Sequence, residues 1–291
     1  MTAWSPARSS IRHRCPRQYL LRYELKAMPT QPDDHGRIVG RVMHAGLAAA
    51  LVARAACAPA DALTRPAMAR YYPTAERAMM THPDYPRLSI AEAMRACGEV
   101  HWTLVAIPPP HPAAILGVEL PFTVNVDGEQ INGVLDYAVR TGENSVHVRD
   151  WKSSAVTWRP TTDPAVPLYG WEARRRWPWA TTITVGIYSI RSRREQVETL
   201  DPDASRYLLD RLVADAREAR AEAAALTTDT VDALYPPRRG EHCRTCSFRS
   251  HCPLFRHVTG LPMRPGINLA TERHRLSRTL EQRSHPELPS T

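Results

Sequence analysis

The spacing of apolar residues predicts mainly helices in the first part of the chain. Over residues 36–56 they recur near every third or fourth position, which predicts a helix that carries His44. A second helical region, broken by prolines, is predicted over 61–101. Ser5 and the proline after it are typical of a helix start. The proline run at 108–110 then predicts a stiff connector at which the helices end.

Beyond residue 110 the apolar spacing changes to every second residue. Residues 120–126 alternate in this way, which predicts a strand closed by a turn at Asp127-Gly128. After it we expect two strands joined by a three-residue loop, a helix, a buried strand and a long helix. These elements are predicted over residues 131–141, 145–152, 166–176, 181–190 and 203–225.

Composition places the chain among soluble globular proteins with a real core. Of its 291 residues, 43% are hydrophobic and 23% charged, which excludes fibrous and wholly disordered chains. The length allows two domains or one large α/β unit. A net charge of +8 favours a polyanionic partner. Only Lys26 and Lys152 among the 38 basic residues are lysines, and neither lies in a Gly-x4-Gly-Lys motif, so we expect no P-loop motor.

The chain shows no pattern of export or membrane insertion. Its first 23 residues lack the apolar run of a secretory signal. The most apolar stretch, 43–60, is interrupted by Arg54 and indicates a core helix rather than a membrane span. We therefore expect a cytoplasmic protein with no membrane partner. In a reducing compartment its six cysteines are better explained as metal ligands, catalytic groups or buried thiols than as disulfides.

Two acidic residues and one lysine fall on neighbouring predicted strands. Asp150 and Lys152 are two residues apart, so their side chains leave the same face. If residues 142–144 form the loop, Asp136 lies directly opposite Asp150. Opposed residues in an antiparallel pair have Cβ atoms about 4.5–5.5 Å apart. The pattern therefore brings two carboxylates and an amine together.

Two carboxylates at that separation repel each other unless a cation lies between them. Oxygen ligands favour Mg²⁺ or Mn²⁺. Lys152 could then orient or deprotonate a water beside a phosphate, or stabilise the negative charge that develops there. The alternative is that Asp136 and Asp150 are solvated residues beside turns and that Lys152 is exposed on its strand.

Three cysteines lie close together near the end of the predicted fold. Cys243, Cys246 and Cys252 span ten residues and suit an iron–sulfur cluster or zinc, either of which needs a fourth ligand. Cys15 is the candidate. The alternatives are unrelated thiols or a zinc site completed by a histidine. These histidines are His242, His251 and His257.

Taken in order, these motifs resemble a known family. They are Cys15-Pro16-Arg17-Gln18-Tyr19, Gly40-x3-His44, Gly133-Val134-Leu135-Asp136, Asp150-Trp151-Lys152 and the three-cysteine cluster. The pattern is similar to that of the PD-(D/E)XK nucleases of RecB type, above all the iron–sulfur subgroup with the CRISPR-associated RecB-like exonucleases and the AddB-type nuclease domains. The resemblance implies an α/β fold with a restriction-endonuclease-like core, in which helices flank a central mixed sheet. We expect one nuclease domain over 1–259 and a disordered tail over 260–291.

The resemblance also implies roles for individual residues. Asp136 and Asp150 would bind the catalytic Mg²⁺ or Mn²⁺, with His44 as a further ligand, and Lys152 would assist the attacking water. The alternative for His44 is a hydrogen-bonded core histidine. A 4Fe-4S cluster would join the N- and C-terminal segments of the domain. Its implied ligands are Cys15, Cys243, Cys246 and Cys252.

Further residues complete the expected site. Glu119 begins a strand where relatives often have a glutamate, and we expect it to support the site or face the metal. Tyr169 matches the tyrosine of the family's Gln-x3-Tyr motif, but the glutamine position is Ala165. Catalysis is therefore weakened, or another residue has taken that role.

Arginine and tryptophan residues are expected to contact the substrate. Arginine neutralises phosphates and tryptophan stacks on unpaired bases, so a group of both suits single-stranded DNA. The alternative is that the tryptophan is a core residue and the arginines form solvated faces. The residues are Arg174, Arg175, Arg191, Arg193 and Trp177.

The function expected from sequence is hydrolysis of DNA phosphodiester bonds by a metal-dependent nuclease. An exonuclease role is favoured, in DNA repair, recombination or CRISPR-type DNA processing. Without a motor it would act on ends or single strands, alone or beside a separate helicase or integrase-like partner. The alternatives are a catalytically weak or inactive, cluster-containing DNA-binding or assembly subunit, and a zinc-stabilised scaffold.

Overall fold

The described part of the chain consists of two compact units. The computed structural model describes residues 3–29, 35–57, 67–155, 159–163 and 165–258. One unit comprises Met1–Pro6 and His35–Val213, and the other comprises Ala7–Asp34 and Ala214–Thr291. A single nuclease domain over 1–259 stays a prediction. The predicted tail over 260–291 lies outside the described residues.

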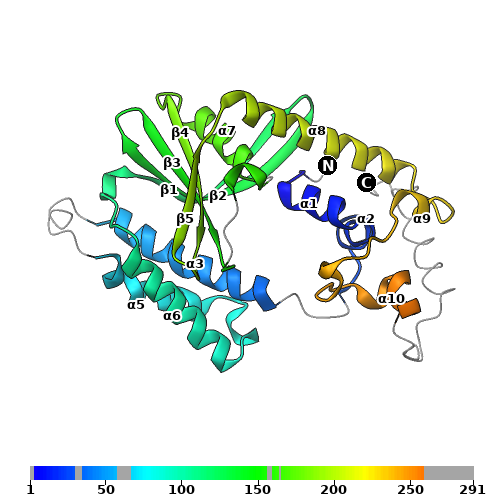
Figure 1. Cartoon of the computed structure of the whole chain (residues 1–291), viewed down its shortest axis with the longest axis horizontal. Helices are drawn as coiled ribbons and strands as arrows, with labels where there is room; N and C mark the ends of the chain where they lie inside the picture. The colour runs from blue at the N-terminus through cyan, green and yellow to red at the C-terminus, as the bar shows by residue number, and fades with distance from the viewer. Residues whose placement is uncertain (1–2, 30–34, 58–66, 156–158, 164, 259–291) are drawn as a thin grey trace, which may run out of the picture. The chain divides into compact units, whose positions relative to one another are not determined.

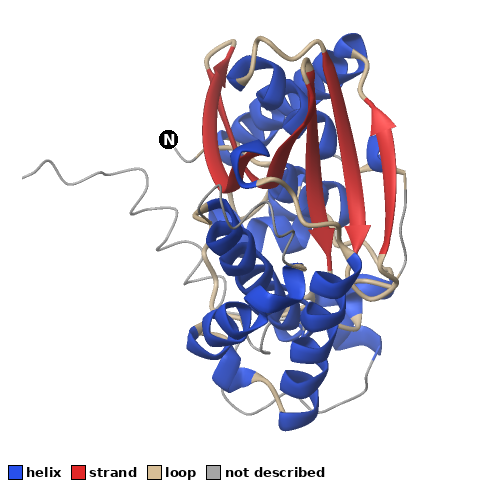
Figure 2. Cartoon of the chain, turned by 90° about the vertical axis from the view of Figure 1, so that its left-hand side faces the viewer, coloured by secondary structure: helices blue, strands red, loops and turns tan. Residues whose placement is uncertain are grey.

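The first unit contains a five-stranded mixed sheet in the order β1-β2-β3-β4-β5 (Figures 1 and 2). All neighbouring strands are antiparallel except β3 and β4, which are parallel. A parallel pair needs a crossover connection, and helix α7 at Val166–Arg176 supplies it. The strands are β1 Ile115–Val126, β2 Glu129–Gly142, β3 Ser145–Lys152, β4 Thr182–Ser189 and β5 Arg194–Thr199. This mixed sheet with flanking helices confirms the predicted α/β fold.

Two details of the sheet differ from the prediction. The apolar spacing does not predict β5, because its polar residues form an edge strand without apolar alternation. The β2–β3 loop is also shorter than predicted, because Gly142 pairs with Ser145 and only residues 143–144 form the turn. The register shifts between Arg140 and Gly142, which absorbs the extra residue. Pairing farther along the strands therefore agrees with the prediction.

Helices α3, α5 and α6 pack with the sheet to form the core of the first unit. α3 (His35–Ala55) presents Val42, Met43, Leu47 and Leu51 at helical spacing, and all four are at most 1% exposed. These residues share one cluster with Tyr137, Trp151 and Tyr188 of the sheet. The other two helices are α5 Tyr72–Thr81 and α6 Ile90–Ala106. The short 3₁₀ helices of this unit are Met68–Tyr71, Tyr85–Arg87, Pro112–Ala114 and Pro160–Thr162.

Within the described residues, α3 alone has the length and apolar character needed to cross a membrane. The stretch is Gly36–Ala55, and half of its most apolar window is buried inside the structure. A buried core helix passes the same test, so this property is weak evidence of a membrane span.

The second unit joins segments from both ends of the chain. Arg12 of α1 (Pro6–Arg14) forms ion pairs with Asp215, Glu218 and Glu222 at 3.8, 3.2 and 2.7 Å. These acids share one face of α8 (Pro202–Ala224), because residues three or four apart on a helix are neighbours. The remaining elements are α2 Pro16–Tyr19, the π-helix Leu20–Glu24, α9 Val231–Leu234, α10 Pro253–Val258 and the 3₁₀ helices Glu241–Cys243 and Arg249–His251.

A buried ionic network ties β5 to the centre of the sheet. Glu195 accepts hydrogen bonds from Arg149 Nε at 2.7 Å and Nη2 at 2.6 Å, and its Oε1 lies 2.9 Å from His147 Nε2. Burial alone would raise the pKa of Glu195, but the hydrogen bonds to His147 and Arg149 outweigh it and lower the pKa to about 2. The strand between them carries Gly186, where an added Cβ would lie 2.3 Å from the Glu195 carboxylate. The glycine therefore leaves room for this carboxylate in its network.

We predict that Glu195→Gln lowers the free energy of unfolding by about 3 kcal/mol at pH 7, because it leaves Arg149 buried without its counter-charge. Since the pKa of Glu195 is lowered on folding, its contribution is present above about pH 4.5 and is lost as the pH falls toward 2. Urea denaturation at pH 7, 5 and 3.5 should show the difference from wild type shrinking below pH 5. The control is Glu198→Gln on the same strand, whose partner Arg159 is 79% exposed, and it should cost at most about 1 kcal/mol. Equal effects of the two variants would contradict the prediction.

Candidate active site

Two strands place a glutamate and an aspartate opposite each other. The β1–β2 register pairs Val118 with Tyr137 and Leu120 with Leu135, so Glu119 lies across from Asp136. Glu119 has a backbone φ of 48°, in the left-handed region. For a residue with a Cβ this conformation costs roughly 1–2 kcal/mol. The strand is therefore held in an unfavourable conformation at the residue whose carboxylate joins the site.

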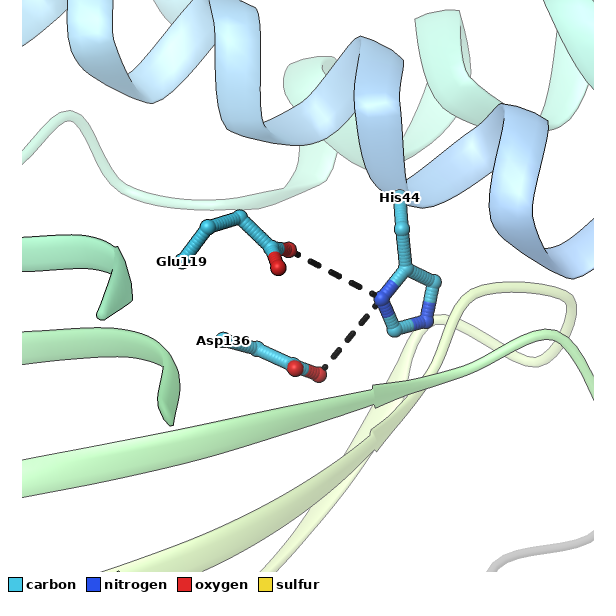
Figure 3. Close-up of side chains that lie close together, drawn as sticks. All are labelled: His44, Glu119 and Asp136. Carbon is cyan, nitrogen blue, oxygen red and sulfur yellow. Dashed lines mark ion pairs between the residues drawn. The ribbon is translucent and has the colours of Figure 1, made fainter. Parts of the chain in front are cut away.

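Helix α3 contributes His44 to the same point, and Figure 3 shows the three side chains directed toward one another. His44 Nδ1 lies 3.6 Å from Asp136 and 3.9 Å from Glu119. Its Nε2 lies 2.8 Å from the carbonyl oxygen of Trp151. A carbonyl only accepts hydrogen bonds, so Nε2 carries the ring proton of neutral His44. Nδ1 then presents its lone pair to the carboxylates, as a metal-binding histidine does.

These three residues can hold a cation. One ligand atom from each lies within 4.8 Å of the other two, and the residues that the structure describes contain no second group of this kind. Burial and the neighbouring Asp136 carboxylate raise the pKa of Glu119 to about 7, although His44 opposes the rise. A divalent cation would relieve this repulsion between the two carboxylates. Two oxygens and one nitrogen suit Mg²⁺ or Mn²⁺.

Asp136 is fixed by the backbone of the next strand. Its Oδ2 accepts a hydrogen bond from the N–H of Trp151 at 2.8 Å. Trp151 follows Asp150. The last β2–β3 pair, Tyr137 with Arg149, is adjacent to the predicted Asp136–Asp150 pair, which stays a prediction. The structure does not add Asp150 to the group of three ligands. That Asp150 binds the same cation as Asp136 and His44 therefore stays a prediction.

Asp150 is instead paired with Lys152. Their Oδ2 and Nζ atoms are 2.7 Å apart, and Asp150 is only 5% exposed. Burial raises the pKa of Asp150 to about 7, with Lys152 lowering it and Asp136 raising it further. Burial alone would lower the pKa of Lys152, but Asp150 and Asp163 outweigh that effect and raise it. Lys152 is therefore an ammonium beside the carboxylates.

Two further side chains border this group. Tyr169 of α7 packs its ring edge-on against Phe122, and its pKa is raised well above its usual value by burial and by Asp150 and Asp136. Its hydroxyl therefore stays protonated. Asp163, which the sequence analysis missed, lies 3.4 Å from Lys152 Nζ. A signal for it was present in its position just before the predicted helix, where aspartate is common, but nothing in that signal indicates a contact with Lys152.

The predicted DNA-contacting residues have mixed surroundings. Trp177 is 8% exposed, so its ring is a core residue and is not open to stacking bases. Arg174 donates a hydrogen bond to the Leu200 carbonyl at 2.7 Å. Arg175 pairs with Glu172 and Arg191 with Glu99, and both arginines keep half or nearly half of their side chains exposed. Arg193 is exposed.

In the second unit, the four predicted cluster ligands line a single cavity of about 380 Å³. All are free thiols, with Cys15 buried and Cys243, Cys246 and Cys252 half-buried. Burial raises the pKa of the Cys246 thiol, and the other three thiols contribute to the rise. His242 also lines the cavity. The predicted alternative ligand His257 has a side chain outside the described part of the structure.

Comparison with known proteins identifies a family and several remote structural similarities. A family model for the PD-(D/E)XK nuclease superfamily matches residues 3–253. A solved structure from Eubacterium rectale, named "Putative exonuclease", is 9% identical, with a TM-score of 0.44 over 93% of this chain and 92% of that chain. The solved structure of SSO0001 is 15% identical, with a TM-score of 0.32 over 81% and 95%. No curated protein matches the chain.

We predict that Mn²⁺ binds the wild-type protein and that two variants each weaken the binding at least 10-fold. Glu119→Gln replaces a charged ligand by a neutral one, and His44→Ala removes the ligand nitrogen. Isothermal titration calorimetry at pH 7.5 measures the affinity. The matched control is Glu143→Gln, which alters an exposed carboxylate in the β2–β3 turn and should bind Mn²⁺ as wild type does. If Glu119→Gln binds equally well, Glu119 is not a ligand.

Proposed function

Because the chain belongs to the PD-(D/E)XK nuclease superfamily, we propose that it is a RecB-type, Mg²⁺- or Mn²⁺-dependent deoxyribonuclease acting as an exonuclease on DNA ends or single strands. The observation that carries this proposal is the convergence of His44, Glu119 and Asp136 beside the Asp150–Lys152 ion pair. A group of cation ligands next to an ammonium is what hydrolysis of a phosphodiester requires.

The donor set of this site fits a hard divalent cation. His44, Asp136 and Glu119 would hold it, and Asp150 would join them from the opposed strand. When bound, the cation polarises a phosphoryl oxygen and lowers the pKa of a coordinated water. The carbonyl of Trp151 keeps Nδ1 of His44 directed at the site. The N–H of Trp151 keeps Asp136 in place.

Lys152 has the role of stabilising charge at the reacting phosphate. Its ammonium group is held between Asp150 and Asp163, so it can donate hydrogen bonds to a phosphate oxygen or orient the attacking water. Such donors act strongly in a partly buried site. The neutral hydroxyl of Tyr169 is a further donor on the same side. Arginine would not suit this position equally well, because its planar fork is larger than an ammonium.

DNA is the proposed substrate. The net charge of +8 and the exposed Arg175, Arg191 and Arg193 suit a phosphate backbone. The protein would work in the cytoplasm in DNA repair, recombination or CRISPR-type processing, with a separate helicase or integrase-like partner. The competing function is a catalytically weak or inactive DNA-binding or assembly subunit, which Ala165 at the usual glutamine position favours.

The four cysteines are proposed to hold a 4Fe-4S cluster that joins the two segments of the second unit. Zinc–sulfur bonds of about 2.3 Å place the sulfurs of a zinc site roughly 3.8 Å apart. The described cysteines form no group of three within 4.8 Å, and this wider spacing favours ligands that each bind a different iron. The cavity between them exceeds what one zinc ion needs. Nε of Arg17 and Nε of Arg249, from two cavity-lining residues, are buried with no hydrogen-bond partner, and such donors suit cluster sulfurs.

Catalysis should depend on Lys152. Lys152→Ala should cleave end-labelled single- or double-stranded DNA about 10²–10³-fold more slowly than wild type in Mn²⁺, because a charge-stabilising donor is lost. The matched control is Lys26→Ala, which changes the chain's other lysine, an exposed residue of the second unit. Equal cleavage by wild type and Lys152→Ala, or cleavage by neither, would contradict the catalytic role, and the latter would favour the DNA-binding subunit.

The proposed cluster should depend on Cys246. Protein purified without oxygen should be brown and absorb at about 400 nm, as cysteine-ligated iron–sulfur clusters do. Cys246→Ser should lose most of the colour and iron. Cys97→Ser, which alters a thiol of α6 outside the cavity, should keep both. A colourless wild-type protein that contains zinc would show that the cysteines bind zinc and not an iron–sulfur cluster.

A further inference from the structure

The segment before α7 supplies a carboxylate that the family pattern does not include. Asp163 follows the 3₁₀ helix Pro160–Thr162, and its side chain is 13% exposed. One carboxylate oxygen, Oδ2, lies 3.4 Å from Lys152 Nζ. The other, Oδ1, accepts a hydrogen bond from the N–H of Ala165 at 2.8 Å. Both oxygens therefore have partners inside the fold.

We infer that Asp163 is a positioning residue that holds the Lys152 ammonium in the active site, and that it does so in place of the glutamine expected at position 165. This inference rests on the nuclease function proposed above. It assigns Asp163 no contact with the substrate, because both of its oxygens face partners inside the fold.

The need for a second anchor follows from the position of Lys152. A lysine side chain has several rotatable bonds, so one contact does not fix its ammonium. The closer partner, Asp150, is itself an expected cation ligand, and a carboxylate that shares its charge with a cation attracts the ammonium less strongly. Asp163 lies on a different segment and is not in the group that can hold the cation. Its attraction for Lys152 is therefore independent of cation binding.

Asp163 is itself held rigidly by the start of α7. Ala165, the residue that precedes the helix, has no side-chain cap of its own. The Asp163 carboxylate instead accepts a hydrogen bond from the backbone N–H of Ala165, which closes a tight local turn. Ala165 contributes its backbone N–H to this arrangement. Asp163 supplies a side chain near Lys152, which the alanine at 165 lacks.

The variant that tests this inference is Asp163→Asn. An asparagine keeps the oxygen that accepts from Ala165 and nearly the same volume, but it removes the negative charge beside Lys152. We expect kcat to fall about 10–100-fold, a loss typical of a misplaced catalytic group. KM and the affinity for Mn²⁺ should stay within twofold of wild type. Asp229→Asn, at an exposed aspartate of the second unit, is the matched control and should leave all three values unchanged.

A double-mutant comparison shows whether Asp163 acts through Lys152. If it does, Asp163→Asn with Lys152→Ala is no slower than Lys152→Ala alone, because the group being positioned is already gone. Additive losses would overturn the inference. A 10-fold loss of Mn²⁺ affinity in Asp163→Asn would also overturn it, since Asp163 would then be a cation ligand.

A spectroscopic test does not depend on catalysis. The chain has only two lysines, so protein labelled with ¹⁵N at lysine Nζ gives two ammonium signals, and the Lys26→Ala variant assigns them. Asp163→Asn should shift the Lys152 signal and speed its hydrogen exchange while the Lys26 signal stays unchanged. An unchanged Lys152 signal overturns the inference. An inactive wild type in which this shift is still seen would refute the nuclease function and leave the contact between Asp163 and Lys152 established.

Discussion

The peptide groups of Trp151 are the point on which the candidate site depends. Beyond the Tyr137–Arg149 pair the β2–β3 ladder ends, and a buried backbone donor and acceptor need new partners there. The N–H of Trp151 is taken by Asp136 and its carbonyl by His44, each at 2.8 Å. Two site residues therefore complete the hydrogen bonding of β3. At the same time the Trp151 side chain, 2% exposed, packs in the core with Tyr137 and Tyr188. Core packing and site geometry are thus coupled through one residue.

The candidate site has an excess of negative charge because the fold places few positively charged side chains beside its carboxylates. Glu119 and Asp150 both have a pKa raised to about 7, primarily by burial. Lys152 offsets part of the negative charge near Asp150, and His44 offsets part of it near Glu119. An excess of carboxylate is therefore left around the three converging ligands. Elsewhere in the sheet, side chains of the protein compensate a buried carboxylate. Arg149 and His147 together lower the pKa of Glu195. This difference supports the proposal that the group of His44, Glu119 and Asp136 binds an external cation.

The sequence was sufficient to predict those parts of the site that depend on strand periodicity. Alternation placed Asp150 and Lys152 on one face, and the β2–β3 register up to the Tyr137–Arg149 pair agrees with the prediction although the predicted loop is one residue too long. The register is kept because the shift between Arg140 and Gly142 compensates for the shorter turn. The left-handed backbone of Glu119 could not be predicted, since it is imposed by the surrounding sheet against the preference of the residue. Strand β5 could not be predicted for a related reason. It pairs with β4, and its Glu195 contacts Arg149 and His147 of β3, but its own sequence has no apolar pattern.

Contacts between segments far apart in the sequence explain the rest of what sequence missed, and Asp163 is the clearest case. The segment before α7 could not be oriented from periodicity, because it has none. Two contacts fix the position of this segment. Asp163 accepts a hydrogen bond from the N–H of Ala165, and its carboxylate is attracted to Lys152 on β3. The alanine at 165 counted against activity in the sequence because it replaces an expected glutamine. Under the proposed role of Asp163, this alanine does not by itself imply weak catalysis, because a carboxylate from the same segment lies next to Lys152.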